Sequence, residues 1–404
     1  MNYAITSFFL LFTVTTLAQK TDTVYTSGGV EEVYYSFSND VVNTIDRTTW
    51  DIGFTTAGFD ASIIINENAG VELYIYGNEI SDWDMVDTAG FTWKSIYNSE
   101  ETWEKGAFAN QGTNHPDYGW GQYNNANHDI NGDRLFIVKN NDGTFSQMVI
   151  EKMSAAGVYT IKIGDLGGAN TSTFTLDKTA AEYASKNFIF YNNTNREVVN
   201  TDAESDSWDL LFTKYYTGIQ AGPEIVYYLV SGIKINKDLA VAERNGVDVS
   251  SNDTSTLSWN ENITEIGSDW KSFNMTTRSY DIVADRAYFV RKSNGDMWKI
   301  YFTNYEGGAL GAYHFVVERM AGSASTQHKE LNSVSVYPNP ASNRLNLVNS
   351  ETNTMHYSLR SLSGSTVVEG DLAAYQSACL DVSTITSGMY ILHLRAGEKA
   401  TSKK

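Results

Sequence analysis

Two histidines set among aromatic residues are the side chains of this 404-residue sequence whose types and spacing best suit binding chemistry. His115 and His128 lie in the segment NQGTNHPDYGWGQYNNANHDINGDRLF (110–136), with Trp120 and Tyr123 between them. Imidazole nitrogens are common ligands of transition metals, and aromatic rings would line an apolar slot beside a bound group. Histidines in polar segments are also frequent in solvated turns, so a turn without a ligand stays open as the alternative.

The later half of the chain offers one comparable donor. Met275 stands eleven residues before Arg286, and its thioether sulfur is a soft ligand. A second donor there would require the fold to bring in Met297 or His314. The alternative for Met275 is simple core filling, the commoner use of methionine.

Several sequence phrases around these candidates occur twice in the chain, in the same order. TWDIGF (49–54) returns as SWDLLF (207–212), and Val-Val-Asn-Thr precedes both phrases. GDRLFIVKNNDGTFSQMVI (132–150) lines up in the same order with ADRAYFVRKSNGDMWKIYF (284–302). Self-similarity at a fixed order indicates tandem duplication. The sequence therefore predicts two similar domains, 19–167 and 168–321.

The repeated phrases have the composition of β-strands. Runs of β-branched and aromatic residues flank the turn sequences at 140–143 and 293–295, so each segment predicts a hairpin. Trp50 and Trp208 are expected to anchor the core, with the adjacent aspartates on the opposite strand face. The predicted fold class is all-β.

Export and partners follow from the first residues and from the charge. Residues 1–18 hold a short apolar stretch ending in Thr-Leu-Ala, which predicts a cleaved secretory signal, and no later window is long enough for a transmembrane helix. The residue directly after this predicted cleavage point is Gln19 rather than a cysteine that could carry a lipid anchor, and the lone Cys379 cannot form an internal disulfide. The net charge of −19 argues against nucleic acid or an anionic membrane surface as the partner.

The last part of the chain changes character. Residues 322–333 are small and polar and predict a linker, and residues 334–404 alternate apolar and polar residues as a small antiparallel β-sandwich does. This tail resembles the type A C-terminal sorting domain of type IX secretion. The motifs that carry the resemblance are YPNP (337–340), LNL (345–347), LDVS (380–383) and GMYIL (388–392). The resemblance implies the type IX machinery as a partner and a secreted or outer cell-surface location. Members of this family usually carry a further apolar strand where this chain ends at Lys404.

The two repeats resemble the HmuY-like family of secreted haem-binding proteins. The resemblance rests on YYSFSNDVVNTIDRTTWDIGF (34–54) and on DRAYFVRKSNGDMWKIYFTNYEGGALGAYHFVVERM (285–320). It implies β-rich domains that bind haem without catalysis, with iron held between two histidine or methionine side chains, and host haemoproteins as possible sources. On this basis His115, His128 and Met275 are the candidate haem ligands, with no separate metal site.

Other chemistries find less support in the sequence. Asp129–Asp133 begins like a calcium loop but lacks the downstream glutamate, so a hairpin turn is the better interpretation. No nucleophile elbow, zinc-protease motif or phosphate loop is present, which predicts a protein that is not an enzyme. The abundant tyrosine and tryptophan leave a second hypothesis open, a cell-surface adhesion or glycan-binding protein that keeps the fold without haem ligands.

Overall fold

The computed structural model describes most of the chain beyond the predicted signal. The described residues are 19–320 without 59 and 114, and 329–403 without 331–333, 339–340, 351–352, 362–365, 387 and 397–398. The predicted signal (1–18) and most of the predicted linker lie outside them. The chain divides into two compact units, Met1–Met320 and Ala321–Lys404. Antiparallel strands dominate both units, so the predicted all-β class is confirmed.

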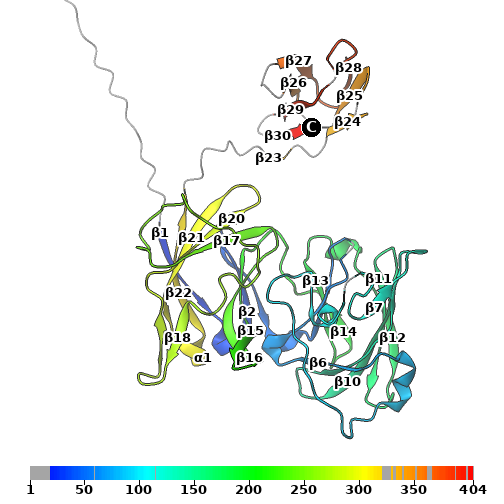
Figure 1. The fold of residues 1–404 in the computed structure, drawn as a ribbon, viewed down its shortest axis with the longest axis vertical. Helices are drawn as coiled ribbons and strands as arrows, with labels where there is room; N and C mark the ends of the chain where they lie inside the picture. Colours follow the sequence, from blue (N-terminus) through cyan, green and yellow to red (C-terminus); the bar gives the residue numbers. More distant parts are fainter. Residues whose placement is uncertain are drawn as a thin grey trace, which may run out of the picture. The chain divides into compact units, whose positions relative to one another are not determined.

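The larger unit has two lobes, and the first lobe is continuous in sequence from β4 to β14 (Figure 1). Its larger sheet runs in the order β12 (Ser172–Asp177), β11 (Val158–Asp165), β10 (Phe145–Met153), β9 (Leu135–Lys139) and β6 (Glu72–Gly77), with β8 (Ile130–Gly132) and β7 (Gly121–Tyr123) joined through β10. Its smaller sheet has the order β14 (Glu197–Val199), β13 (Phe188–Asn192), β4 (Ile52–Thr55) and β5 (Ile63–Ile65).

The second lobe is built from β15 to β22 and is completed by the first three strands of the chain. One sheet has the order β1 (Gln19–Tyr25), β22 (Ala312–Arg319), β21 (Met297–Tyr305), β20 (Ala287–Lys292) and β17 (Leu239–Arg244). The other has the order β16 (Glu224–Ile235), β15 (Leu210–Ala221), β2 (Glu31–Ser36) and β3 (Asp40–Asp46), and β18 (Lys271–Asn274) pairs with β19 (Ser279–Ile282).

Helices are short in the described residues and serve as turns. They are the single α-helical turn α1 (Gly307–Leu310) and the 3-10 turns η1 (Ser27–Gly29), η2 (Arg47–Thr49), η3 (Glu67–Ala69), η4 (Ile80–Met85), η5 (Ala107–Ala109) and η6 (Ala181–Tyr183).

The two predicted hairpins are confirmed. β9 pairs with β10 across the turn at 140–143, and β20 pairs with β21 across the turn at 293–295. Trp50 and Trp208 are both buried, and they lie in the same hydrophobic core rather than in separate ones. The sheets do not divide at the predicted boundary of 167/168, because β12 to β14 pair with strands of the first lobe. The division into domains 19–167 and 168–321 stays a prediction from the sequence.

One set of contacts recurs around the two Trp-Asp phrases. The amide of Asp51 donates to the carbonyl of Tyr191 (2.9 Å), and the amide of Asn193 donates to the Asp51 carboxylate (2.7 Å). Asp51, directly before β4, thereby fixes the β13–β14 hairpin.

The second phrase makes the reciprocal contacts. The amide of Asp209 donates to the carbonyl of Tyr35 (2.8 Å), and the amide of Phe37 donates to the Asp209 carboxylate (2.8 Å). Asp209 thus fixes the β2–β3 hairpin. The two Trp-Asp phrases therefore make matching contacts, each with a hairpin that is far away in the sequence.

The smaller unit is a two-sheet structure with its own core. Its core side chains are mainly leucines, with Leu347 and Met355 fully buried. One sheet has the order β23 (Lys329–Glu330), β30 (Lys399–Lys403), β29 (Tyr390–Ala396), β26 (Met355–Ser361) and β27 (Thr366–Leu372). The other has the order β24 (Val334–Tyr337), β25 (Arg344–Asn349) and β28 (Ser377–Asp381). These strands match the sandwich predicted for the tail.

Candidate functional site

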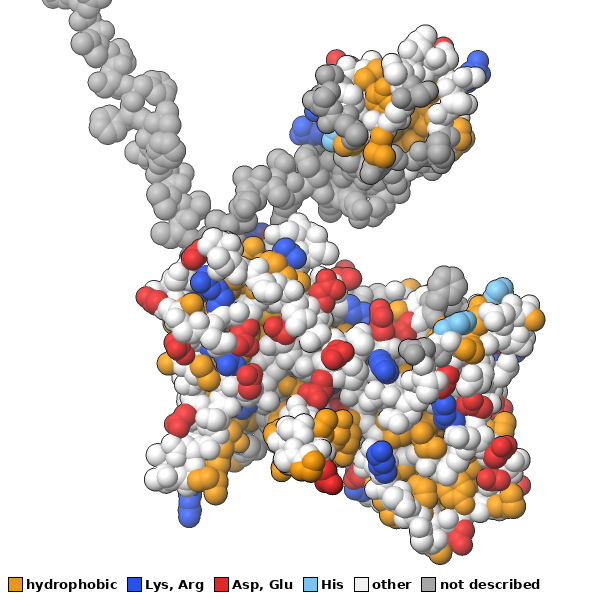
Figure 2. Space-filling model, viewed as in Figure 1, with side chains coloured by type: hydrophobic (Ala, Val, Ile, Leu, Met, Phe, Trp, Pro, Cys, Tyr) orange, Lys and Arg blue, Asp and Glu red, His pale blue; other side chains and the backbone are white. Residues whose placement is uncertain are grey.

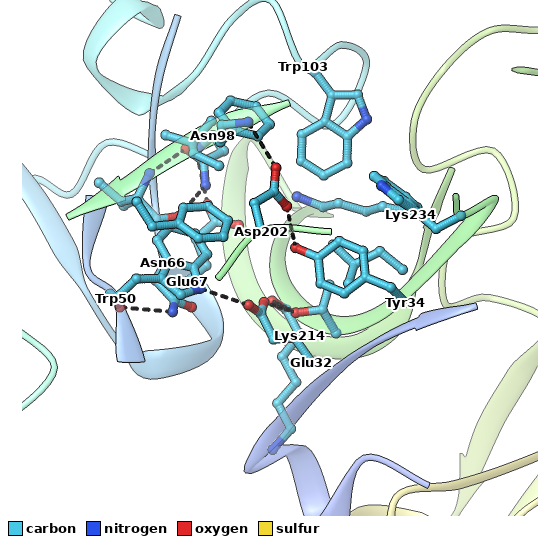
Figure 3. A pocket seen from close by; sticks show the side chains of 17 residues that line it. Glu32, Tyr34, Trp50, Asn66, Glu67, Asn98, Trp103, Asp202, Lys214 and Lys234 are labelled. Carbon is cyan, nitrogen blue, oxygen red and sulfur yellow. Dashed lines mark hydrogen bonds between the residues drawn. The ribbon is translucent and has the colours of Figure 1, made fainter. Parts of the chain in front are cut away.

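A cavity of about 40 Å³ lies where the two lobes meet (Figure 3). Aromatic and polar side chains share its wall, which includes Trp50 and Trp103 from the first half of the chain and Trp208 from the second. Trp50 stacks on Phe190 with ring centroids 4.2 Å apart. The tryptophans of the two Trp-Asp phrases therefore line the same cavity and pack in the same core between the lobes.

Buried carboxylates line this cavity, and the protein supplies donors to each. Glu32 accepts hydrogen bonds from the Trp50 indole (3.0 Å) and the Thr213 hydroxyl (2.6 Å). Asp202 accepts from the amide of Phe188 (2.9 Å) and from the hydroxyl of Tyr34 (3.1 Å). Burial raises the pKa of both carboxyl groups, and it raises the pKa of Asp202 to about 6.

The cavity also holds a buried cation. Lys234 extends toward its centre below Trp103, with its ammonium 5.3 Å from the Trp103 ring and 5.0 Å from the Tyr215 ring (Figure 3). Burial lowers the pKa of Lys234, while the nearby Glu67 and Glu32 oppose that shift. Cation–π contacts and two buried carboxylates thus stabilise the charge.

This cavity is a polar joint between the lobes rather than a cofactor slot. Its volume of about 40 Å³ has room for only a few water molecules. The carboxylates already accept hydrogen bonds from groups of the protein itself. They therefore help to hold the two lobes in their relative position. Sequence patterns did not reveal the joint, because Glu32, Asp202 and Lys234 are far apart in the chain.

The structure brings the two candidate histidines to the same tyrosine. The ring of Tyr123 lies 5.2 Å from the His115 ring and 6.0 Å from the His128 ring, measured between centroids. The Tyr123 hydroxyl is 2.6 Å from Nδ1 of His128. Both histidines are exposed.

Met275 is not part of that group. It lies in the turn between β18 and β19 of the second lobe, with 80% of its surface exposed. Met297 packs with a separate cluster at the start of β21, and both ring nitrogens of His314 have polar neighbours, Thr23 and Glu306. Neither supplies Met275 with a second donor in the described structure.

The calcium-like segment is used internally. The Asp129 carboxylate pairs with Lys152 (2.8 Å) and accepts from the amide of Ala155 (2.9 Å). Asp133 accepts from the side chain of Gln122 (2.8 Å). Within the described residues, no group of three or more His, Cys, Asp and Glu side chains is placed to hold a metal ion.

An exposed aromatic patch on the first lobe is a stronger candidate for ligand contact. We define the aromatic patch as the exposed Trp93 and Phe145, the half-buried Tyr76 and Phe91, and the buried Tyr74. The Trp93 ring lies 4.9 to 5.1 Å from those of Phe91, Tyr74 and Phe145. Trp93 is 44% exposed and Phe145 is 37% exposed. Figure 2 shows hydrophobic side chains gathered on the surface around β6 and β10, the strands that carry part of this patch.

Polar groups border the aromatic patch. Glu72 forms an ion pair with Lys139 (2.5 Å) and accepts from the hydroxyls of Tyr74 and Ser95. Phe91 and Trp93 come from the segment 86–106, which connects η4 to η5 and has only an isolated bridge at Ile96. Connections of this length without secondary structure usually serve a function. The phrase TWKSIYN (92–98) contains Trp93, but its exposure is not apparent from the sequence.

Comparison with known proteins identifies the smaller unit. Residues 335–404 match the family described as the secretion system C-terminal sorting domain. The tail is a type IX secretion sorting domain. It directs the protein to the cell surface or the medium, as predicted, and makes the type IX machinery a partner.

The other comparisons add no family for the larger unit. No curated protein matches the sequence. Among solved structures, the dimeric latent PorU from Porphyromonas gingivalis shares 10% identity over 68% of this chain and 31% of that chain, with a TM-score of 0.16. A likeness at that score carries no conclusion about fold or function. In the described part of the chain, no helix is long and apolar enough to cross a bilayer.

Proposed function

We propose that the sorting domain exports a non-enzymatic binding protein that attaches to glycans through the aromatic patch. The observation that carries this proposal is the exposure of Trp93 and Phe145 together on one surface. Side chains of this size are usually withdrawn from water, and contiguous exposed aromatic surface is typical of interaction sites.

Carbohydrate is the ligand class that suits the chemistry of the patch. The electron-rich face of an aromatic ring attracts the partly positive C–H groups on one face of a pyranose ring. The hydroxyls at the rim of a sugar need donors and acceptors, and the Glu72–Lys139 pair and Ser95 lie beside the rings. A location outside the cell gives such a surface access to polysaccharide.

A glycan array followed by calorimetry tests this function. We expect Trp93→Ala to weaken binding of the selected glycan about tenfold or more, a loss of about 1.4 kcal/mol. The control is Tyr25→Ala in the second lobe, a tyrosine that is 57% exposed and lies outside the patch. Failure to bind any glycan, or equal affinity for the two variants, would contradict the proposal. Release of product from a panel of hydrolase substrates would contradict its non-enzymatic part.

We further propose that the larger unit arose by tandem duplication within an HmuY-like lineage. The reciprocal contacts of Asp51 and Asp209 support the duplication, since each fixes the hairpin of the other repeat. Because the HmuY-like family consists of haem-binding proteins, haem is the second candidate ligand.

The observation that favours haem is the placement of His115 and His128 beside Tyr123. Haemin titration of the mature protein tests it. Haem binding predicts a Soret shift that His115→Ala and His128→Ala each abolish and that Met275→Ala leaves in place if the first lobe alone binds. An unshifted spectrum removes haem from consideration.

A further inference from the structure

The long β15–β16 hairpin exposes apolar residues that the rest of its lobe does not cover. Each strand has twelve residues, and the β4–β5 hairpin at the matching place in the first lobe is far shorter. Along β16 the exposed apolar side chains are Ile225, Val226, Tyr227, Tyr228 and Leu229, with exposed fractions between 38% and 58%. Figure 2 shows hydrophobic side chains gathered at this hairpin.

β16 is also the edge strand of its sheet, since the order there is β16, β15, β2 and β3. The direction of its free backbone groups follows from contacts near its end. The amides of Ile233 and Ile235 donate away from β15, to the carbonyls of Gly267 and Ile263. Because backbone groups alternate along a strand, those of residues 225, 227 and 229 also point away from β15. No strand of the described structure pairs with them.

The usual protections of an edge strand are missing from this segment. Natural edge strands carry lysines, prolines or bulges that prevent pairing with another chain. Between residues 217 and 231 the only charged side chain is Glu224, and Pro223 lies in the turn before β16. The β15–β16 pairing is regular over all twelve residues, without a bulge.

We propose that β16 pairs antiparallel with β16 of a second copy of this chain, about a two-fold axis at Tyr227. In this register Tyr227 faces Tyr227 of the second copy, and Ile225 faces Leu229. About six backbone hydrogen bonds form, because residues 225, 227 and 229 each contribute a donor and an acceptor. Glu224 faces Val230, so the like charges of the two copies are not opposed. Two-fold pairing uses the same patch on both partners and therefore ends at a dimer.

This charge pattern is the reason for preferring a second copy over another partner. A strand without a charge near its centre pairs with itself without repulsion, although the chain as a whole carries −19. One face of the hairpin is already anchored, since Tyr227 stacks on Tyr97 of the first lobe at 4.3 Å. The regular β15–β16 pairing itself holds β16 in the extended form that pairing with a second copy requires.

Cysteine crosslinking tests the register in the mature chain with Cys379→Ser, which removes the exposed native thiol. Tyr227→Cys places two thiols opposite each other and predicts a covalent dimer on mild oxidation. Tyr228→Cys is the matched control, since residue 228 is similarly exposed but faces Val226 of the second copy. It predicts little crosslinking. Equal crosslinking of the two variants would overturn the proposal.

Sedimentation over a range of concentrations tests the dimer itself. Leu229→Lys is expected to raise its dissociation constant about tenfold or more, because a charge enters the paired edge. Leu310→Lys is the control, another exposed leucine, on α1 and away from β16 in the sequence. Thermal melting confirms that both variants are folded. A monomer at every concentration, or a dimer that both variants leave unchanged, would also overturn the proposal.

Discussion

The first lobe is complete within one stretch of chain, whereas the second lobe needs strands from the opposite end of the same unit. β4 to β14 follow each other between residues 52 and 199, but β15 to β22 require β1, β2 and β3. The tyrosines of β2 lie in the core of the second lobe, where the Tyr35 ring contacts those of Phe212 and Phe315. Because β1 to β3 precede the first lobe in the chain but pair in the second, they connect the two lobes into one compact unit.

The lobes also differ in the segments that each has beyond the matching contacts of Asp51 and Asp209. Asp51 and Asp209 make matching hydrogen bonds, yet the first lobe adds the long segment 86–106 with Trp93, and the second adds the β15–β16 hairpin. The candidate surfaces lie on these additions. The comparison suggests that shared buried polar contacts preserve the fold while exposed additions determine binding.

Removing the first three strands should have the largest effect on this comparison. Deleting residues 19–46 takes away the partners of β15 and β22, so we expect the second lobe to lose cooperative unfolding while the first keeps its sheets. Circular dichroism and proteolysis of the deletion variant measure this.

A rearranged chain provides the control for the deletion. Gln19 pairs with Glu318, so residues 19–46 attached after Met320 through a short linker can reach their native position. We expect this chain to regain the second lobe. A deletion variant with both lobes intact would refute the closure.

Replacing either repeated aspartate should have the next largest effect. Asp51→Ala leaves the amides of Asn141 and Asn193 without their acceptor. Asp209→Ala leaves the Phe37 amide and the Lys292 ammonium without theirs. Each variant should lose about 3 kcal/mol of unfolding free energy. Urea unfolding of the two variants measures the loss. Asp248→Ala, at an exposed turn, is the control and should change little. A large loss in one variant alone would show that the lobes do not depend on the contact equally.

The polar joint predicts a smaller, pH-dependent effect. Burial raises the pKa of Glu32 above its ordinary value of 4.5, so the folded state holds this proton more tightly than the unfolded state. The stability from this carboxyl is present below pH 4.5 and is lost as the pH rises through the folded pKa. We expect Glu32→Gln to flatten that decline while keeping an acceptor for the Trp50 indole. Unfolding free energies at several pH values measure it, and a slope equal to that of the native chain would contradict the assignment.

The sequence predicts local structure well here and long-range pairing poorly. Hairpins such as β9–β10 follow from alternating side chains and a turn, which are properties of neighbouring residues. The partner of β2 is β15, far along the chain, and no local pattern distinguishes it from β4. The burial of Lys234 between aromatic rings is equally invisible, because its neighbours come from both lobes. Tryptophan burial was predictable, but the surface position of Trp93 depends on how the segment 86–106 lies over the sheet.

Hydrogen–deuterium exchange of the Asp209→Ala chain tests the strand closure most directly. Destabilising the second lobe should accelerate exchange in residues 31–46 together with residues 210–235, since β2 pairs with β15. Residues 135–165 of the first lobe should exchange as they do in the native chain. Residues 31–46 that stay protected while 210–235 open would contradict the closure of the second lobe by the first strands.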